Sequence, residues 1–205
     1  MSDGPQSATV GCVLGAGFEA TLDAARAGDD AAFASLWRDL QPPVLRYLVV
    51  ASGSVAEDLA SETWLRVALG LARFDGDEAG FRAWVFTIAR HRLVDWRRRE
   101  TRARTVVRPG EQFAGRAAGD DPAADALERV STDEALALIA MLPPDQAEVV
   151  SLRAVAGLDV GDVARVLGKR PGAVRVLAHR GLRRLAELLA DELPRGGPPA
   201  GVVTP

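Results

Sequence analysis

Residues Asp159 to Ala178, DVGDVARVLGKRPGAVRVLA, decide the fold of the C-terminal part of this chain. Apolar residues recur at helical spacing from Val160 to Leu167, and Gly168 then permits a tight turn. Pro171 fits the first turn of a second helix, because proline is tolerated there. A short helix, a tight turn and a second helix form a helix-turn-helix, which is what this stretch predicts.

The second predicted helix would present basic side chains to solvent. A helix fits the major groove of DNA, and side chains near its N-terminus reach the base edges. We expect Arg170 and Arg175 to contact bases or adjacent phosphates, and later residues to contact phosphates. A helical hairpin with a basic solvent-exposed face is the competing interpretation. The candidate DNA-binding residues of this motif are Lys169, Arg170, Arg175, His179, Arg180 and Arg183.

A second basic segment lies upstream of this motif. Between Arg90 and Arg104 the chain holds seven arginines and only two acids, although its net charge over 205 residues is -3. Local positive patches on an acidic protein can neutralise DNA phosphates, while the acidic remainder limits indiscriminate binding. The charge distribution therefore favours two contacts with nucleic acid, and two solvated helix faces are the alternative.

The N-terminal half of the chain also has helical periodicity. Apolar residues recur at helical spacing between Phe18 and Val50, with helix breaks expected at Gly28-Asp29-Asp30 and at Pro42-Pro43. We expect Ser54 to be the N-cap of the next helix, and a further helix to start near Gly80. Since no stretch alternates apolar and polar residues as a strand would, we expect a helical bundle.

The helical pattern stops between Thr101 and Pro122, where Gly, Ala, Pro and acids dominate, and returns at about Ala123. Pro143-Pro144 marks the start of another helix. We therefore expect an all-α chain of two small helical domains joined by a flexible linker, with the helix-turn-helix in the C-terminal domain. The expected boundaries are a disordered arm (1–17), a helical domain (18–100), a linker (101–130), a helix-turn-helix domain (131–190) and a disordered tail (191–205).

Composition restricts the location of the protein. Cys12 is the only cysteine, so the chain forms no intrachain disulfide and has no cysteine-based zinc site. No apolar run reaches the length of about 18 residues that a membrane span needs, and residues 1–17 lack the basic start of a signal peptide. We expect a cytoplasmic protein without membrane insertion.

Signs of an active site are weak. His91 and His179 are the only histidines, and both lie in basic segments. The sequence contains no Walker loop, Ser-His-Asp arrangement or cluster of metal ligands, and Asp75 with Asp77 fits a solvated loop. We expect no catalytic residue, no bound metal, no cofactor and no small-molecule substrate.

Several motifs together resemble a known family. Residues 142–146, LPPDQ, with Gly157-Leu158, Leu167-Gly168 and Val174-Arg175, resemble the C-terminal region of extracytoplasmic-function sigma factors. In that family this region docks on the minus-thirty-five promoter element. Residues 56–66, AEDLASETWLR, resemble the family helix that binds the clamp of core RNA polymerase, and residues 81–90, FRAWVFTIAR, resemble its promoter-melting helix. The resemblance spans roughly Phe18 to Leu189.

The resemblance implies a sigma factor that directs RNA polymerase to promoters and initiates transcription. Its implied partners are the clamp of core RNA polymerase, promoter DNA and an anti-sigma factor. The implied polymerase-binding residues are Asp58, Leu59, Glu62, Thr63, Leu65 and Arg66. The implied minus-ten contacts are Arg82, Trp84, Arg90, Arg97 and Arg98, near a loop from Phe74 to Gly80 that would capture a flipped base.

Two of these assignments have structural alternatives. Asp58, Glu62 and Arg66 share a helix face and would also form an exposed salt-bridge row worth only ~0.3 to 0.5 kcal/mol per pair. Trp84 and Phe86 are candidates for stacking on bases, but aromatic residues at helical spacing more often belong to a core.

The sequence departs from the family pattern at several positions. His91 stands where asparagine is common, and Leu177 replaces a frequent basic residue. Pro171 and Ala173 alter the start of the reading helix, so the DNA sequence preference cannot be transferred from relatives.

Two other functions remain as alternatives at this point. A conventional helix-turn-helix regulator would use its N-terminal half to sense a ligand or to dimerise, and a helical adaptor would bind only protein. Binding of core RNA polymerase through the segment from Asp58 to Phe74 distinguishes the sigma factor from both.

Overall fold

The structure is a computed structural model that describes residues 15–106 and 124–192. In these residues the regular elements are all helical, which confirms the predicted all-α class. The N-terminal module consists of α1 (Phe18–Arg26), α2 (Asp30–Ser52), α3 (Ala56–Gly70) and α4 (Glu78–Val106). The C-terminal module consists of α5 (Ala124–Ala140), α6 (Pro144–Val150), α7 (Val160–Leu167) and α8 (Pro171–Glu192).

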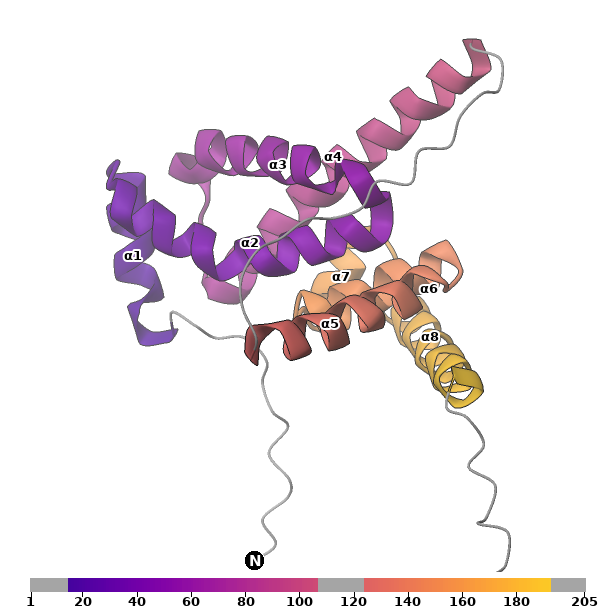
Figure 1. Ribbon diagram of the computed structural model, residues 1–205. Coiled ribbons are helices and arrows are strands. Elements are labelled where there is room, and N and C mark those ends of the chain that lie inside the picture. Colours follow the sequence, from indigo (N-terminus) through magenta and orange to yellow (C-terminus); the bar gives the residue numbers. More distant parts are fainter. Residues whose placement is uncertain (1–14, 107–123, 193–205) are drawn as a thin grey trace, which may run out of the picture.

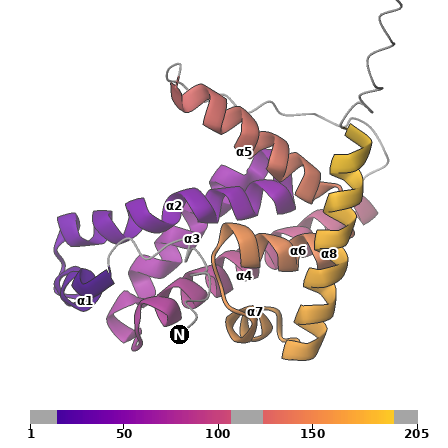
Figure 2. The ribbon, with the colours of Figure 1, turned by 90° about the horizontal axis from the view of Figure 1, so that it is seen from below.

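The two modules pack directly against each other. Figure 1 shows α5 to α8 gathered on one side of the α1 to α4 bundle, and Figure 2 shows α5 beside α2 and α7 beside α4. Between the modules, residues 107–123 lie outside the described part, as do most of the predicted arm with Cys12 and most of the predicted tail. None of the described helices combines the length and apolar character that a membrane span requires.

The chain turns between α1 and α2 where the sequence predicts a break. Gly28 has a φ of +92°, a conformation that favours glycine, and the Asp29 carboxylate accepts a hydrogen bond from the backbone N–H of Ala32 at 2.9 Å. The other expected break, at Pro42-Pro43, does not occur, because α2 continues through both prolines. Leu40 and Val44 on either side of the pair are buried, and this burial offsets the backbone hydrogen bonds that two prolines cannot donate.

The starts of α3 and α4 differ from the sequence prediction. Ser54 does not cap α3, since it lies within a 3-10 turn, Gly53–Val55, that leads into the helix without a side-chain cap. Asp77 caps α4, because its carboxylate accepts a hydrogen bond from the backbone N–H of Gly80 at 2.8 Å. The helix therefore begins at Glu78, before the predicted start near Gly80.

Both ends of the predicted linker, 101–130, are helical. At its start α4 continues to Val106, and at its end α5 begins at Ala124. The exposed Arg99 and Arg102, in the C-terminal part of α4, suit the negative end of the helix dipole.

The predicted helix-turn-helix is confirmed. The Asp159 carboxylate accepts a hydrogen bond from the backbone N–H of Asp162 at 2.7 Å and so caps α7. Gly168 ends α7 in the left-handed conformation with φ of +62°, and α8 then begins with Pro171. Val174 is completely buried, so this side of α8 faces the rest of the module and the opposite side faces solvent.

A single apolar core extends across both modules. It includes Tyr47 and Phe86 from the N-terminal bundle and Leu152 and Val163 from the C-terminal module, all of them buried. A smaller cluster surrounds Ile139, Leu142, Ala147 and Val150, and Val50 of α2 packs against it. The modules are therefore joined by apolar contacts as well as by the chain.

Candidate nucleic-acid interface

The exposed face of α8 carries the predicted DNA-reading side chains. Arg170, Arg175 and His179 are exposed, and the buried Val174 fixes which way the helix faces. Lys169 lies in the turn before α8, where its Nζ is 3.3 Å from a carboxylate oxygen of Asp145. This exposed ion pair is weak in water and leaves Lys169 free to exchange its partner for a phosphate.

The second half of α8 continues the basic face. Arg180, Arg183 and Arg184 are exposed. Glu187 lies 3.6 Å from the Nε of Arg183 and 3.1 Å from an Nη of Arg184. Since all these groups face water, the ion pairs contribute little and do not compete strongly with DNA.

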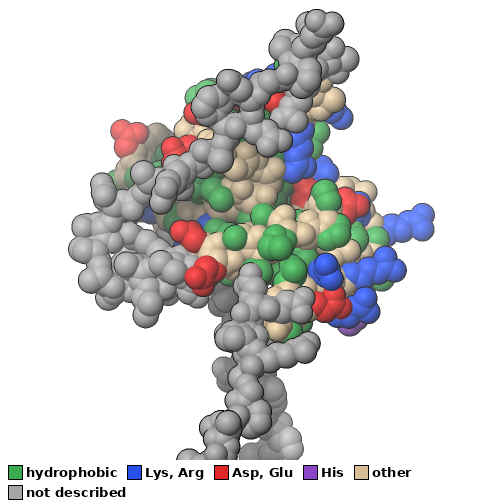
Figure 3. All heavy atoms as spheres, turned by 45° about the vertical axis from the view of Figure 1, so that its right-hand side comes forward, with side chains coloured by type: hydrophobic (Ala, Val, Ile, Leu, Met, Phe, Trp, Pro, Cys, Tyr) green, Lys and Arg blue, Asp and Glu red, His purple; other side chains and the backbone are tan. Residues whose placement is uncertain are grey.

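The C-terminal half of α4 forms a second basic surface. Arg97 and Arg98 are exposed, as predicted for DNA contacts, but Arg97 also donates a hydrogen bond from Nη2 to the carbonyl oxygen of Ala51 at 2.9 Å. That bond ties the arginine to the end of α2. Figure 3 shows Lys and Arg side chains in separate groups on one face of the molecule, with hydrophobic surface between them.

A groove of about 630 Å³ runs between α3 and the second half of α4. It brings together charged residues that the sequence assigns to two different tasks, polymerase binding on α3 and DNA binding on α4. Its positive side chains outnumber its negative ones, so the groove favours an anionic partner. The groove is lined by Glu62, Leu65, Arg66, Arg92, Asp95, Arg98, Arg99 and Arg102.

The outer face of α3 presents four of the predicted polymerase-binding residues. Asp58, Leu65 and Arg66 are exposed, and Glu62 is half-buried. Leu65 exposes 61% and Leu69 exposes 69% of its surface, and because the two lie one helical turn apart they form an exposed apolar patch suited to a partner. Leu69 does not appear among the sequence candidates.

Leu59 and Thr63, the other two predicted polymerase contacts, lie on the inner face of α3. Leu59 is 3% exposed and Thr63 is completely buried, with its hydroxyl donating to the carbonyl oxygen of Leu59 at 2.6 Å. Their spacing of four residues places both on the stripe that packs into the core. Both side chains are buried within the N-terminal module and are not available at its surface.

Arg82 also differs from its predicted role as a DNA contact. It is 8% exposed, and its Nη2 lies 3.3 Å from a carboxylate oxygen of Asp39. Burial raises the pKa of the Asp39 carboxyl, Arg82 opposes this rise, and Glu78 adds to it. The burial and the ion pair give Arg82 a structural role inside the N-terminal module.

Trp84 lies in an aromatic cluster beside the predicted base-capturing loop. Its ring centroid is 5.0 Å from that of Phe74 and 5.8 Å from that of Phe81. Gly70 leaves room for the indole, because a Cβ at this position would lie 2.8 Å from the ring. Arg26 of α1 donates a hydrogen bond to the carbonyl oxygen of Phe74 and so fixes the start of the loop. Trp84 is partly buried, and Phe86 is fully buried in the core.

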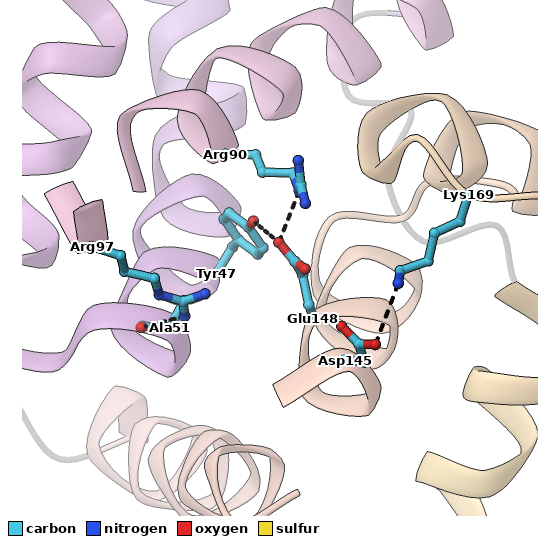
Figure 4. Close-up of polar contacts among 7 residues, drawn as sticks. All are labelled: Tyr47, Ala51, Arg90, Arg97, Asp145, Glu148 and Lys169. Carbon is cyan, nitrogen blue, oxygen red and sulfur yellow. Dashed lines mark hydrogen bonds and ion pairs between the residues drawn. The ribbon is translucent and has the colours of Figure 1, made fainter. Parts of the chain in front are cut away.

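Arg90 is turned towards the C-terminal module. Its Nε donates to Oε1 of Glu148 at 3.0 Å, and the hydroxyl of Tyr47 donates to the same oxygen at 3.2 Å. Figure 4 shows both side chains pointing towards Glu148. Burial, followed by the charge of Glu148, raises the pKa of Tyr47 well above its usual value, so the phenol keeps its proton. Tyr47 and Glu148 were not candidates, because their contact joins positions 101 residues apart.

The described residues offer no alternative metal site. Across 15–106 and 124–192, no three His, Cys, Asp or Glu side chains lie close enough together to hold a metal ion.

Comparisons with known proteins assign the chain to a family. The model for Sigma-70 region 2 matches residues 36–103, and the model for Sigma-70, region 4 matches residues 132–185. The ECF RNA polymerase sigma factor BldN of Streptomyces coelicolor is 36% identical over 173 residues, covering 83% of this chain and 65% of BldN. The ECF RNA polymerase sigma factor SigD of Mycobacterium tuberculosis is 34% identical over 176 residues, covering 82% of each chain.

The chain belongs to the ECF sigma factors of RNA polymerase. Its function is therefore to direct RNA polymerase to promoters, and it is a regulatory DNA-binding protein. The region 2 match covers α3 and most of α2 and α4, whereas the region 4 match covers the helix-turn-helix.

Solved structures show the same fold for this sigma factor. CnrH, solved in complex with the cytosolic domain of CnrY, has a TM-score of 0.58 and 20% identity, covering 84% of this chain and 97% of CnrH. The sigma factor RpoE from Bartonella quintana, solved in complex with the anti-sigma factor NepR, has a TM-score of 0.54 and 23% identity. The match covers 77% of this chain and 98% of RpoE. At these identities the likeness concerns the fold alone.

Proposed function

We propose that this sigma factor divides promoter recognition between its modules, with α8 on the minus-thirty-five element and α4 on the minus-ten region. The arrangement of α8 carries this proposal, because Val174 is buried while Arg170, Arg175 and His179 face solvent. A helix held in this way can enter the major groove with its N-terminal half against the bases. On α4, the exposed Arg97 and Arg98 are the proposed phosphate contacts, together with Arg90 once Glu148 releases it.

We further propose that the outer face of α3 binds core RNA polymerase. Asp58, Glu62 and Arg66 supply charge on this face, and Leu65 and Leu69 supply exposed apolar surface. A charged rim around an apolar centre is the usual composition of a protein interface. The polymerase would perform the chemistry of RNA synthesis, so the sigma factor itself needs no catalytic residue.

Substitutions on α3 test the polymerase contact. Asp58→Lys should weaken binding to core RNA polymerase by roughly tenfold or more, since loss of a charge pair in an interface typically costs about 2 kcal/mol or more. Glu57→Lys is the matched control, because Glu57 is also exposed on α3 but is not among the proposed contacts. Equal affinity of the two variants for core polymerase, measured by fluorescence anisotropy, would contradict the assignment of this face.

In vitro transcription tests the whole proposal. Core RNA polymerase with this sigma factor should initiate at a subset of genomic promoters, and Arg175→Ala should reduce initiation at those promoters. If the chain alone binds an operator as a tight dimer and does not associate with core polymerase, a conventional regulator replaces the sigma-factor function.

We also propose an anti-sigma factor as a partner and a cytoplasmic location. RpoE from Bartonella quintana was solved with such a partner, and the exposed leucines of α3 offer a surface that an inhibitor would cover. Affinity purification of the tagged chain from its native cells, followed by mass spectrometry, should recover core polymerase and an inhibitory protein. Recovery of polymerase alone would remove the anti-sigma partner from the proposal.

A further inference from the structure

We propose that Glu148 acts as an internal competitor of DNA, occupying Arg90 in place of a phosphate and holding the two modules in a closed form. This inference rests on the proposed role of Arg90 in minus-ten binding. It adds a regulatory contact within the chain, which operates without a partner protein.

The polar contact at the joint resembles the binding of a phosphate oxygen. Glu148 on α6 reaches across to the N-terminal module, where its Oε1 accepts hydrogen bonds from Arg90 at 3.0 Å and from Tyr47 at 3.2 Å (Figure 4). A carboxylate and a phosphate both present anionic oxygens that accept charge-assisted hydrogen bonds from a guanidinium group. Arg90 cannot bind a phosphate with its Nε while Glu148 occupies that donor.

Burial strengthens this contact. The side chain of Glu148 is 14% exposed and that of Arg90 is 24% exposed, whereas Tyr47 is completely buried. Water and salt screen such a pair less than they screen the exposed pairs of α8. Removal of the Glu148 carboxylate would destabilise the closed form, because the guanidinium of Arg90 would then be partly buried and unpaired.

Apolar packing surrounds the pair and defines one closed arrangement. Val50 of α2 packs against a cluster that includes Leu142 and Val150, and α7 packs along α4. The contact between α7 and α4 lies on the helix that would approach the minus-ten DNA. A duplex therefore reaches this part of α4 only after the modules separate.

The test measures DNA binding and shape in the full-length chain. The DNA probe is a fluorescein-labelled single strand of mixed sequence, followed by anisotropy, and the radius of gyration comes from small-angle X-ray scattering. Glu148→Ala should increase the affinity for the probe by roughly tenfold, since a hydrogen bond to a charged group stabilises by about that factor. It should also increase the radius of gyration. Glu134→Ala is the control, because Glu134 is an exposed acid on α5 in the same module.

Two further variants keep the test decisive. Tyr47→Phe keeps the ring in the core and removes only the hydroxyl, and should increase the affinity roughly threefold. In the Glu148→Ala background, Arg90→Ala should abolish most of the gain. Equal affinity and equal radius of gyration for Glu148→Ala and Glu134→Ala would overturn the proposal, as would a gain that persists without Arg90.

A separate measurement distinguishes this inference from the proposed function. Arg90→Ala should reduce promoter-directed transcription by the complete polymerase. If transcription is unchanged, Arg90 is not a promoter contact and the proposed role of α4 fails there. If transcription falls but Glu148→Ala behaves like Glu134→Ala, only the internal competition fails.

Discussion

Arg175 follows the fully buried Val174 on α8, and this neighbour holds the arginine at the solvent side of the reading helix. Arg175→Ala should weaken promoter binding. If the guanidinium contacts a phosphate, the slope of log affinity against log salt concentration should become shallower by about 0.9. If it contacts a base, the discrimination between base pairs at that promoter position should change by about 1–3 kcal/mol. Titrations at several salt concentrations measure both effects.

Arg38→Ala is the charge-matched control for this prediction. Arg38 is an exposed arginine of α2 whose guanidinium bonds within its own helix, to Ala34 and Ser35. If both variants weaken promoter binding equally, the effect comes from net charge and Arg175 has no specific contact.

Asp162 gives the stability of the protein a specific pH dependence. Burial raises the pKa of this carboxyl above 3.8, Asp159 and Asp77 add to the rise, and Arg165 opposes it. Because the folded protein holds this proton more tightly than the unfolded chain, the contribution of Asp162 to stability is present below about pH 3.8 and is lost as the pH rises through the folded pKa.

The Asp162→Asn variant cannot ionise at this position. Its free energy of unfolding relative to the wild type should therefore increase between acidic and neutral pH. Urea unfolding across this pH range measures the difference, and Asp133→Asn, at an exposed position on α5, is the matched control. A difference for Asp162→Asn that does not change with pH would show that the buried carboxyl does not titrate as described.

At the scale of elements, the contact between α6 and α8 depends on the absence of a side chain at Gly181. A Cβ there would lie 2.7 Å from Cγ2 of Val150, a stiff β-branched side chain that cannot easily move away. Gly181→Ala should therefore lower the free energy of unfolding by about 1–2 kcal/mol, because overpacking outweighs the higher helix propensity of alanine.

Gly172→Ala is the control on the same helix. A Cβ at Gly172 has no neighbouring atom within 4 Å, so only the gain in helix propensity remains. Its stability should stay equal to or above that of the wild type by up to about 1 kcal/mol. Chemical denaturation measures the free energy of unfolding of both variants. A Gly181→Ala variant as stable as the wild type would mean that α8 can move away from α6.

The elements were predictable where a local signal decides them. The break at Gly28-Asp29-Asp30 and the tight turn at Gly168 were predicted correctly, because glycine chemistry acts over a few residues, whereas the cap expected at Ser54 was wrong. The continuation of α2 through Pro42-Pro43 was not predictable in this way, because burial of the surrounding residues in a distant core overrides the local preference.

The candidate site was predicted in part. The exposed arginines of α8 and the charged face of α3 lie where their helical positions place them. Arg82 differs, since a charge on an apolar stripe does not reveal that Asp39 of another helix lies within 3.3 Å. Leu59 and Thr63 belong to the core stripe, and the resemblance to a family motif gave them a partner-binding role that their burial does not support.

At the scale of the whole molecule, the modules share apolar contacts and should unfold together. Val50→Asp places a charge against the cluster around Val150, so it should separate the thermal unfolding of the two modules into two transitions. Val49→Asp is the control, because the neighbouring Val49 is 41% exposed. Differential scanning calorimetry should show one transition for the wild type and for Val49→Asp. A single transition for Val50→Asp would mean that this contact does not couple the modules.

The arrangement of the modules is the feature that the sequence did not reveal. Glu148 meets Tyr47 and Arg90 across a long stretch of chain, and nothing in the local pattern of α6 distinguishes this acid from a solvated one. Long-range contacts of this kind depend on the complete fold, in contrast to caps and turns.

The shared joint limits how this protein can be recombined with its relatives. A chimaera that joins residues 15–106 to the C-terminal module of another sigma factor would bring together two surfaces that are not matched to each other. A chimaera would have to keep Glu148 together with Tyr47 and Arg90. It would also have to keep Val50 of α2 together with the apolar cluster around Val150. Exchanging promoter specificity by grafting should therefore succeed when only the solvent side of α8 is replaced, and should disturb control of the free protein when the entire half is replaced.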